Sequence, residues 1–252
     1  MPYPVLNPSQ PDPALKAKCA LAVMAKAPRP GKVKTRLSPP LTAEQSAALY
    51  VCFLRDTVRC IAEVADTSEA MGLVCYTPVG DEGLFDGLLH EGFALVAQRG
   101  DGFGARLLAA AEDILGCGFG AVCLIDSDSP TVPASAFRQA VEELGRPGDR
   151  IVLGGSSDGG YYLIGLKAAH PEPFSGIHWS TSTVYAETVS AIAGAGIELV
   201  ELPLWYDVDD GETLQLLHDE LLRDVLPPFA KEPGSPAVHS RRFLLEFSGV
   251  GK

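Results

Sequence analysis

The run Cys19-Ala-Leu-Ala-Val-Met-Ala-Lys26 decides the fold, because it is almost uninterrupted in apolar residues and ends in a loop rich in Pro, Gly and basic residues. A run of this length between breakers is typical of a strand that is buried on both faces of a parallel sheet. Comparable strand patterns occur at 71–77, 93–98, 120–125, 150–155, 161–166 and 197–203. Helical patterns occur at 42–64, 83–90, 104–115, 133–144, 181–193 and 211–222. This alternation predicts an α/β fold with a mostly parallel sheet that helices cover.

The domain organisation follows from the same patterns. A length of 252 residues fits one large domain or two small ones. Strands and helices alternate from 18 to 225 without a break, so we expect a single domain there. Residues 1–17 contain five prolines and little periodicity, which predicts a flexible leader. Several prolines and Gly234 interrupt the last residues, so 226–252 is predicted to be an irregular tail.

Apolar runs and cysteines bear on the compartment. No apolar run approaches the roughly 18 residues that a membrane span needs, so we expect no membrane span. The six cysteines include no Cys-x-x-Cys pair, and several lie inside apolar runs. That usage is typical of reduced thiols in a protein core, and it predicts a cytoplasmic protein.

The charge of the chain is unevenly distributed. Lys and Arg number 20 and Asp and Glu number 32, which gives a net charge of −12 and argues against a nucleic-acid partner. Yet no acidic residue occurs between Pro13 and Ala43. One basic segment in an acidic protein predicts a small anionic ligand there. The basic residues of this segment are Lys16, Lys18, Lys26, Arg29, Lys32, Lys34 and Arg36.

Most of these cations lie in the loop 26–36, directly after the first strand. The carboxyl ends of strands form the ligand crevice of an open α/β sheet, and cations with free backbone N–H groups suit a phosphate or diphosphate. The loop lacks the residue order of a P-loop, and a solvated basic loop is the alternative interpretation. Arg36 is also a candidate catalytic residue, because it could neutralise a leaving diphosphate. The candidate phosphate-binding residues are Lys26, Gly31, Lys34, Thr35 and Arg36.

Two Asp-x-Asp pairs follow other predicted strands, Asp126-Ser-Asp128 and Asp207-Val-Asp209. Neighbouring carboxylates repel each other unless a cation lies between them. Mg²⁺ or Mn²⁺ prefers oxygen ligands and keeps waters and substrate phosphates as its remaining ligands, so we expect these four aspartates to be metal ligands. The alternatives are that Asp126 forms a turn and that Asp128 precedes a helix as a cap. Asp210 is expected to cap the last predicted helix.

Two glycine-rich segments compete with this interpretation. Gly155-Ser-Ser-Asp-Gly159 matches the GxSxG pattern of serine hydrolases, but strand residues follow it where the nucleophile elbow requires a helix. A hydrolase is therefore a minor alternative. Asp158 in this segment could bind sugar hydroxyls or act as a catalytic base, or it could be a plain turn residue. Gly100-Asp-Gly-Phe-Gly104 could let the backbone approach a nucleotide, with Gly104 as a candidate binding residue.

Four segments, in this order, resemble a known bacterial family: Met24-Ala-Lys-Ala-Pro-Arg-Pro-Gly-Lys-Val-Lys-Thr-Arg-Leu37, Asp126-Ser-Asp-Ser-Pro130, Asp158-Gly-Gly-Tyr-Tyr-Leu-Ile-Gly-Leu166 and Asp207-Val-Asp209. The chain is similar to nucleotide-diphospho-sugar transferase-like proteins, some of which are associated with arsenosugar biosynthesis. The resemblance extends over about 19–222. It implies a single-domain, glycosyltransferase A-like three-layer sandwich, a fold that also houses phospholactate guanylyltransferase and cytidylyltransferases.

The resemblance also implies a nucleotide-binding half, an acceptor half, and a metal held by the middle and late aspartates. Family members commonly have Gly at the position of Asp126, which favours Asp128 as the metal ligand. The usual Thr after the late Asp is Asp210 here, so the resemblance does not decide between Asp207 and Asp209.

These observations together predict a metal-dependent transferase that uses a nucleotide-activated donor. The first hypothesis is glycosyl transfer from a nucleotide sugar to a small acceptor, which the Asp-x-Asp element suits. The second is nucleotidyl transfer from a nucleoside triphosphate, which the basic loop suits. A sensor that binds nucleotide sugars without catalysis is a third. In either reaction, positioning and electrostatic stabilisation of the leaving phosphate would supply most of the rate.

Overall fold

The computed structural model describes residues 3–249, and a seven-stranded sheet forms its centre. The strand order is β3-β2-β1-β4-β6-β5-β7. Strand β6 pairs antiparallel with β4 and β5, whereas all other strand pairs are parallel. The sheet is thus mostly parallel, as predicted. The strands are β1 (Cys19–Lys26), β2 (Ala70–Thr77), β3 (Ala94–Ala97), β4 (Ala121–Ile125), β5 (Arg150–Ser156), β6 (Tyr161–Leu166) and β7 (Glu198–Trp205).

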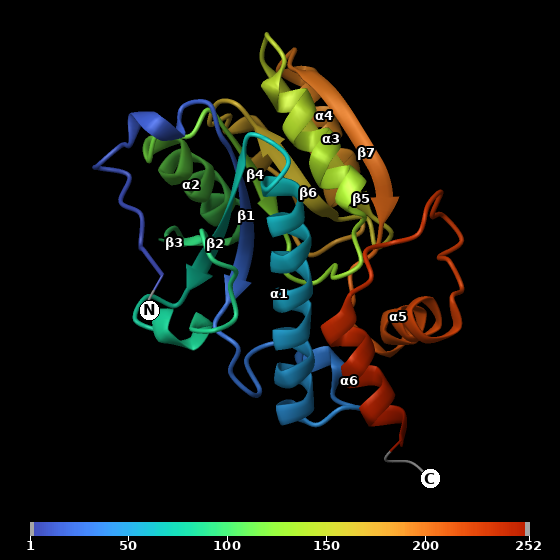
Figure 1. Ribbon diagram of the computed structural model, residues 1–252. Coiled ribbons are helices and arrows are strands. Elements are labelled where there is room, and N and C mark those ends of the chain that lie inside the picture. Colours follow the sequence, from blue (N-terminus) through green and yellow to red (C-terminus); the bar gives the residue numbers. More distant parts are fainter. Residues whose placement is uncertain (1–2, 250–252) are drawn as a thin grey trace.

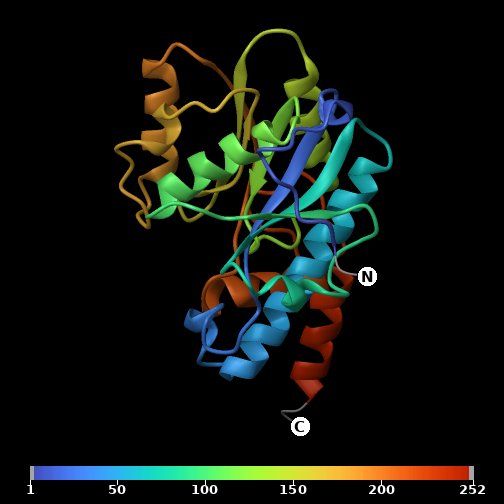
Figure 2. The ribbon, with the colours of Figure 1, turned by 90° about the vertical axis from the view of Figure 1, so that its left-hand side faces the viewer.

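Helices cover both faces of the sheet and make a three-layer sandwich (Figures 1 and 2). One outer layer contains α1 (Ala43–Ala65), α3 (Ala134–Gly145) and α6 (Val238–Gly249), with α5 (Gly211–Arg223) beside them. The other contains α2 (Phe103–Gly116) and α4 (Val184–Gly194). Short 3-10 helices occur at Pro13–Leu15, Thr35–Leu37, Glu82–Phe85 and Glu172–Phe174.

Strand β1 shows why the sheet needs a helix layer on each face. Its residues Leu21 and Val23 belong to the core under α1, whereas Ala20 and Ala22 belong to the core under α2. All four are fully buried, which accounts for an apolar run without alternation. The predicted capping box at the start of α1 is present, because Thr42 and Gln45 bond each other's backbone N–H groups. No helix within 3–249 is long and apolar enough to cross a membrane.

The helix predicted at 83–90 is only a 3-10 turn, Glu82–Phe85. Phe85 is its one buried side chain, and the next residue, Asp86, leaves the helical region with a ψ of 127°. A segment with so little apolar area to bury gains little from completing further helical turns.

Within residues 3–249, the segments near both ends form contacts that the sequence did not predict. The leader pairs with the sheet edge: the Leu6 N–H donates to the Leu95 carbonyl, and the Leu95 N–H donates to the Pro4 carbonyl, each over 2.8 Å. Residues 4–6 of the predicted leader thus pair with the edge strand β3, a contact that the sequence did not predict. The tail at 226–252 is not irregular throughout, because α6 forms within it and packs on α1.

A long-range cap stabilises α6. The carboxylate of Asp56, on α1, accepts hydrogen bonds from the backbone N–H groups of His239 and Ser240 over 2.9 and 2.8 Å. It also accepts a hydrogen bond from the Ser240 hydroxyl over 2.6 Å. The capping group for this helix thus comes from a distant part of the sequence, which local patterns do not reveal.

Candidate nucleotide-binding site

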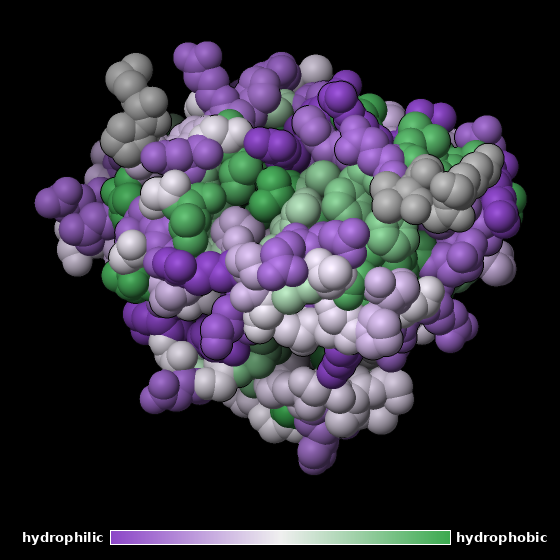
Figure 3. Space-filling model, turned by 90° about the horizontal axis from the view of Figure 1, so that it is seen from below, coloured by the Kyte–Doolittle hydropathy of each residue, from purple (hydrophilic) through white to green (hydrophobic). Residues whose placement is uncertain are grey.

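A large pocket lies at the carboxyl ends of the parallel strands. In Figure 1 the arrowheads of β1 and β7 point to the lower side of the molecule, and Figure 3 shows that face, with apolar residues in green among hydrophilic ones in purple. The pocket has a volume of about 700 Å³, within the range of small-molecule sites. Its lining includes residues that follow β1, β4, β5 and β7.

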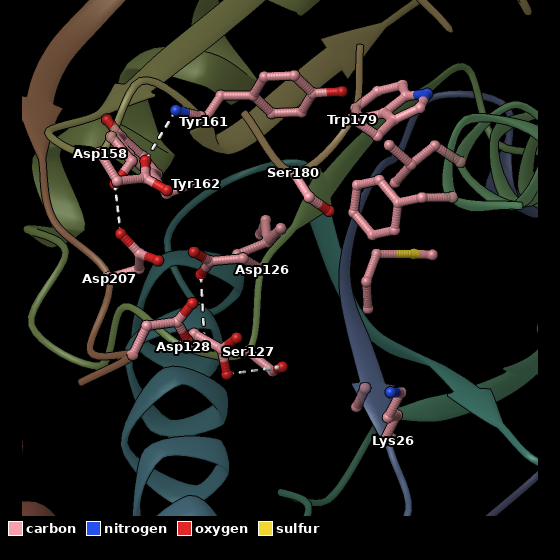
Figure 4. A pocket seen from close by; sticks show the side chains of 18 of the residues that line it. Lys26, Asp126, Ser127, Asp128, Asp158, Tyr161, Tyr162, Trp179, Ser180 and Asp207 are labelled. Atoms are coloured by element: carbon pink, nitrogen blue, oxygen red, sulfur yellow. Dashed lines mark hydrogen bonds between the residues drawn. The ribbon is translucent and has the colours of Figure 1, made fainter. Parts of the chain in front are cut away.

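The two Asp-x-Asp loops lie side by side in this pocket. The Val208 N–H donates to the backbone carbonyl of Asp128 over 2.9 Å and joins the loop after β7 to the loop after β4. Figure 4 shows the carboxylates of Asp126, Asp128 and Asp207 along one side of the pocket. Asp209 also lines it, so the fold brings all four predicted metal ligands together.

The first aspartate of each loop accepts a hydrogen bond from a serine. The Ser129 hydroxyl donates to Asp126 Oδ2, and the Ser156 hydroxyl donates to Asp207 Oδ1, each over 2.7 Å. Ser129 belongs to the same loop as its partner, whereas Ser156 ends the neighbouring strand β5. These bonds hold the two carboxylates against the inner wall of the pocket.

The second aspartate of each loop contacts Lys34. The Lys34 ammonium lies 2.9 Å from Asp128 Oδ1 and 2.8 Å from Asp209 Oδ1. Its side chain is only 4 % exposed and its Nζ lies 5.9 Å from the centre of the Phe53 ring. The backbone of Lys34 is left-handed, with φ 47° and ψ 41°, a conformation uncommon for residues other than glycine. Lys34 therefore points inward and pairs both loops with one cation.

Burial and like charges shift the titration of these groups. Burial raises the pKa of Asp126 well above its ordinary value, and the neighbouring Asp128 carboxylate raises it further. Burial likewise raises the pKa of Asp207, to about 6. For Lys34, burial lowers the pKa, but the carboxylates of Asp128 and Asp209 outweigh burial and the net shift is upward. The pocket thus concentrates negative charge that a cation stabilises.

Other cations surround this centre. Arg36 is 75 % exposed at its side chain, and its Nη1 lies 3.5 Å from Asp209 Oδ2. Arg29, in contrast, forms an ion pair with Asp81 and does not line the pocket. The pocket-lining members of the basic loop, with Thr35 among them, are Lys26, Lys32, Lys34, Thr35 and Arg36.

Two predicted nucleotide-binding glycines, Gly31 and Gly104, are not among the residues that line the pocket. Gly31 has a positive φ of 71° in the basic loop. A Cβ at Gly104 would lie 2.5 Å from the backbone carbonyl oxygen of Phe174, so α2 packs too closely for any side chain there. This close packing explains why glycine occurs at position 104.

Asp158 lies beside Asp207 in the pocket, and aromatic rings lie next to this group of carboxylates (Figure 4). Asp158 is exposed on the turn between β5 and β6, and its Oδ1 accepts the Gly160 N–H over 2.7 Å. Tyr161 and Trp179 lie above the carboxylates in Figure 4, with ring centres 6.4 Å apart, and Phe103 lies 5.0 Å from Trp179. The segment after Gly155 continues into β6, so the strand-to-helix elbow of a serine hydrolase is not formed.

The donor set suits a metal with few protein ligands. Within the described part of the chain, no three His, Cys, Asp or Glu side chains are placed to hold a metal ion together. Asp128 and Asp209 nevertheless direct one oxygen each at the same point, where the Lys34 ammonium now serves as the cation. Two carboxylates of this kind fit Mg²⁺ or Mn²⁺ when waters and phosphate oxygens complete the ligand shell.

Comparison with known proteins supports the fold. A model of the family described as "Uncharacterized protein conserved in bacteria (DUF2064)" matches residues 60–181. A solved structure from Desulfovibrio desulfuricans G20, provisionally assigned as a nucleotide-diphospho-sugar transferase, shares 29% identity. That alignment covers 92% of this chain and 98% of the other, with a TM-score of 0.74. The chain has the nucleotide-diphospho-sugar transferase fold. The fold class and the family resemblance inferred from the sequence are thereby confirmed.

A more distant structure extends this likeness of fold. The 4-diphosphocytidyl-2C-methyl-D-erythritol synthase of Anaerococcus prevotii DSM 20548 is 11% identical, with a TM-score of 0.51. The alignment covers 83% of this chain and 97% of the synthase. No curated protein matches the chain.

Several pocket residues were not predicted from the sequence. Arg106, in the first turn of α2, and Tyr50, on α1, both line the pocket, as does Trp179. The phenol oxygen of Tyr50 accepts the Lys26 N–H over 3.1 Å and fixes the start of the basic loop. Arg106 follows the Gly100–Gly104 loop, and that proximity is the one local signal that could have identified it. Trp179 lies in a loop with no motif.

Proposed function

We propose that this protein is a metal-dependent transferase that moves a glycosyl group from a nucleotide sugar to a small acceptor. The transferase class is supported by the D. desulfuricans relative, which spans nearly the whole chain. The observation that carries the proposal is the joining of two Asp-x-Asp loops and one basic loop in a single pocket. The Val208–Asp128 backbone bond and the Lys34 ion pairs hold these three loops together.

The basic loop is assigned to the donor phosphates. Lys26, Lys34, Thr35 and Arg36 all line the pocket and offer ammonium, hydroxyl and guanidinium donors. Arg36, which is mostly exposed, is free to contact a leaving diphosphate, on which negative charge develops. A guanidinium can bond two phosphate oxygens at once, which orients the leaving group as well as stabilising it.

Mg²⁺ or Mn²⁺ is assigned to Asp128 and Asp209, with Asp126 and Asp207 behind them. A bound divalent ion supplies Lewis-acid neutralisation of the phosphates. The two inner carboxylates are held by Ser129 and Ser156 and so keep the loops in shape.

The acceptor is assigned to the side of the pocket that contains Asp158. This carboxylate is exposed, it is oriented by the Gly160 N–H, and it faces the same cavity as the aspartate loops. It is placed to bind a sugar hydroxyl or to accept a proton from an acceptor hydroxyl. The rings of Tyr161 and Trp179 provide an apolar wall for the acceptor or for the sugar.

Nucleotidyl transfer is the second candidate. The observation that favours it is the amount of positive charge on one pocket, because α2 adds Arg106 to the basic loop. A nucleoside triphosphate carries more charge than a nucleotide sugar and would use more of these cations. The six free cysteines support a reducing, cytoplasmic location for either enzyme.

A thermal-shift screen tests the proposal. Nucleotide sugars and nucleoside triphosphates are added with Mg²⁺ or Mn²⁺, and a rise in Tm reports binding to the folded state. Stabilisation by a nucleotide sugar, followed by release of a nucleoside diphosphate on adding acceptors, supports glycosyl transfer. Stabilisation by a triphosphate with release of pyrophosphate supports the second candidate. Binding without turnover indicates a sensor, and no shift with any nucleotide contradicts the whole proposal.

A further inference from the structure

Lys34 occupies the place between the aspartate loops that a metal would need. Its Nζ lies within 2.9 Å of one oxygen of Asp128 and within 2.8 Å of one oxygen of Asp209. Both partners come from the ends of strands, and these are the two carboxylates that point at the same site. No other lysine or arginine in residues 3–249 pairs with Asp128.

The position of Lys34 is built into the loop. Its left-handed backbone is unfavourable for a residue with a Cβ, so the surrounding structure must enforce it. The flanking Val33 and Leu37 provide that support, since they are 5 % and 0 % exposed and anchor the loop in the core. The Lys34 side chain is 4 % exposed, and its Nζ lies 5.9 Å from the centre of the Phe53 ring. The ammonium therefore belongs to the site and is not a surface charge that happens to reach it.

A divalent ion and this ammonium cannot share the two carboxylates. Asp128 and Asp209 are 33 % and 41 % exposed, so solvent and a ligand can reach them, while the ammonium between them is almost inaccessible. Like charges a few ångströms apart in partly buried surroundings repel strongly. Occupation by one cation thus requires the other to leave.

We propose that Lys34 is a built-in competitor for the divalent-metal site, and that a ligand phosphate frees the site by taking over the ammonium as its own partner. The competition itself follows from the position of Lys34, whereas the role of the phosphate rests on the proposed function. Metal and nucleotide then bind with positive coupling, and the protein without nucleotide has low affinity for the metal.

Binding of Mn²⁺ alone tests the competition. Mn²⁺ is titrated into the nucleotide-free wild type and into Lys34→Met, and free Mn²⁺ is followed by electron paramagnetic resonance. Lys34→Met keeps the length of the side chain and removes its charge, so we expect it to bind Mn²⁺ about tenfold more tightly, within the range usual for coupled sites. Lys32→Met is the matched control, because Lys32 lines the same pocket without an ion pair to either aspartate. It should change the affinity much less.

Equal Mn²⁺ affinity in the wild type and Lys34→Met would overturn the inference, as would weaker binding by the variant. Lys34→Gln repeats the test with a polar side chain, in case the apolar one unfolds the loop, and added Mn²⁺ should raise the Tm of either variant more than that of the wild type. The titration contains no nucleotide. A failed nucleotide screen therefore contradicts the proposed function and leaves the competition result standing. A failed Mn²⁺ titration overturns the competition between Lys34 and the metal and leaves the proposed function standing.

Discussion

The two Asp-x-Asp loops of the pocket, 126–128 after β4 and 207–209 after β7, look alike in sequence but are held differently. In both, the first aspartate accepts a serine hydroxyl over 2.7 Å and the second contacts Lys34. The loop after β4 uses its own Ser129. The loop after β7 uses Ser156 from β5, and a helix begins directly after it.

This comparison teaches that position within the pair decides the role of a carboxylate, while the neighbouring elements decide how the loop is supported. The inner aspartates, Asp126 and Asp207, have pKa values raised by burial, and their role is to stabilise the conformation of the loops. The outer aspartates, Asp128 and Asp209, face a cation and are open to ligand. The first loop supplies its own serine donor, whereas the second takes its serine donor from β5 and leads directly into α5.

Replacing the outer aspartates should have the largest effect. Asp128→Ala and Asp209→Ala are each expected to weaken Mn²⁺-dependent nucleotide binding about 100-fold or more, because each removes an oxygen from the cation position. Asp126→Asn and Asp207→Asn, which keep a polar group of the same shape, should weaken it much less. Isothermal titration calorimetry with the nucleotide found by thermal shift measures both pairs. Unchanged binding by Asp128→Ala would refute the metal assignment, and equal losses in all four would refute the division into inner and outer roles.

Removing the serines should have a smaller effect that separates the two loops. Ser156→Ala breaks a bond between β5 and the second loop and leaves a half-buried carboxylate short of a donor, so we expect it to lower the free energy of unfolding by about 2 kcal/mol. Ser129→Ala breaks a bond within one loop, where the Asp128 N–H still faces the Asp126 carboxylate, and should cost about 1 kcal/mol. Urea unfolding measures both. A larger cost for Ser129→Ala than for Ser156→Ala would show that the bond within the first loop contributes more to stability than the bond from β5.

The arrangement of strands made much of the site predictable. Asp128, Asp209 and the basic loop each follow an apolar run, and the carboxyl ends of parallel strands must converge. The four aspartates were expected as one cluster on that ground, and the pocket contains all of them. Whether they bind metal stays a prediction.

The remaining features depend on long-range contacts that no local pattern encodes. The inward turn of Lys34, as opposed to the exposed Arg36, depends on a left-handed residue between two core anchors. Helix α6 depends on a carboxylate of Asp56, 183 positions before His239. The leader pairs with the edge of β3, and its prolines gave no sign of that pairing.

The smallest expected effect concerns Asp210, which supports the second loop from the side of α5. Its Oδ1 accepts the backbone N–H groups of Glu212 and Thr213 over 3.1 and 3.0 Å, a capping arrangement that the first loop lacks before α3. Asp210→Ala should lower the free energy of unfolding by about 1 kcal/mol, and Asp210→Asn, which can also cap, should cost far less.

The pH dependence of stability separates the contribution of the Asp210 charge from that of its hydrogen bonds. The Thr213 N–H and the other cap donors lower the pKa of Asp210 below its ordinary value. The folded state then holds the carboxylate more strongly than the unfolded state does, so the contribution is complete above about pH 4 and is lost as the pH falls through the lowered pKa. Urea unfolding between pH 3 and 7 should show this loss in the wild type and not in Asp210→Asn. Mn²⁺ binding should change little in either Asp210 variant. If an Asp210 variant lost as much Mn²⁺ affinity as Asp209→Ala, then the helix cap, and not the contact with Lys34, would hold Asp209 in its binding position.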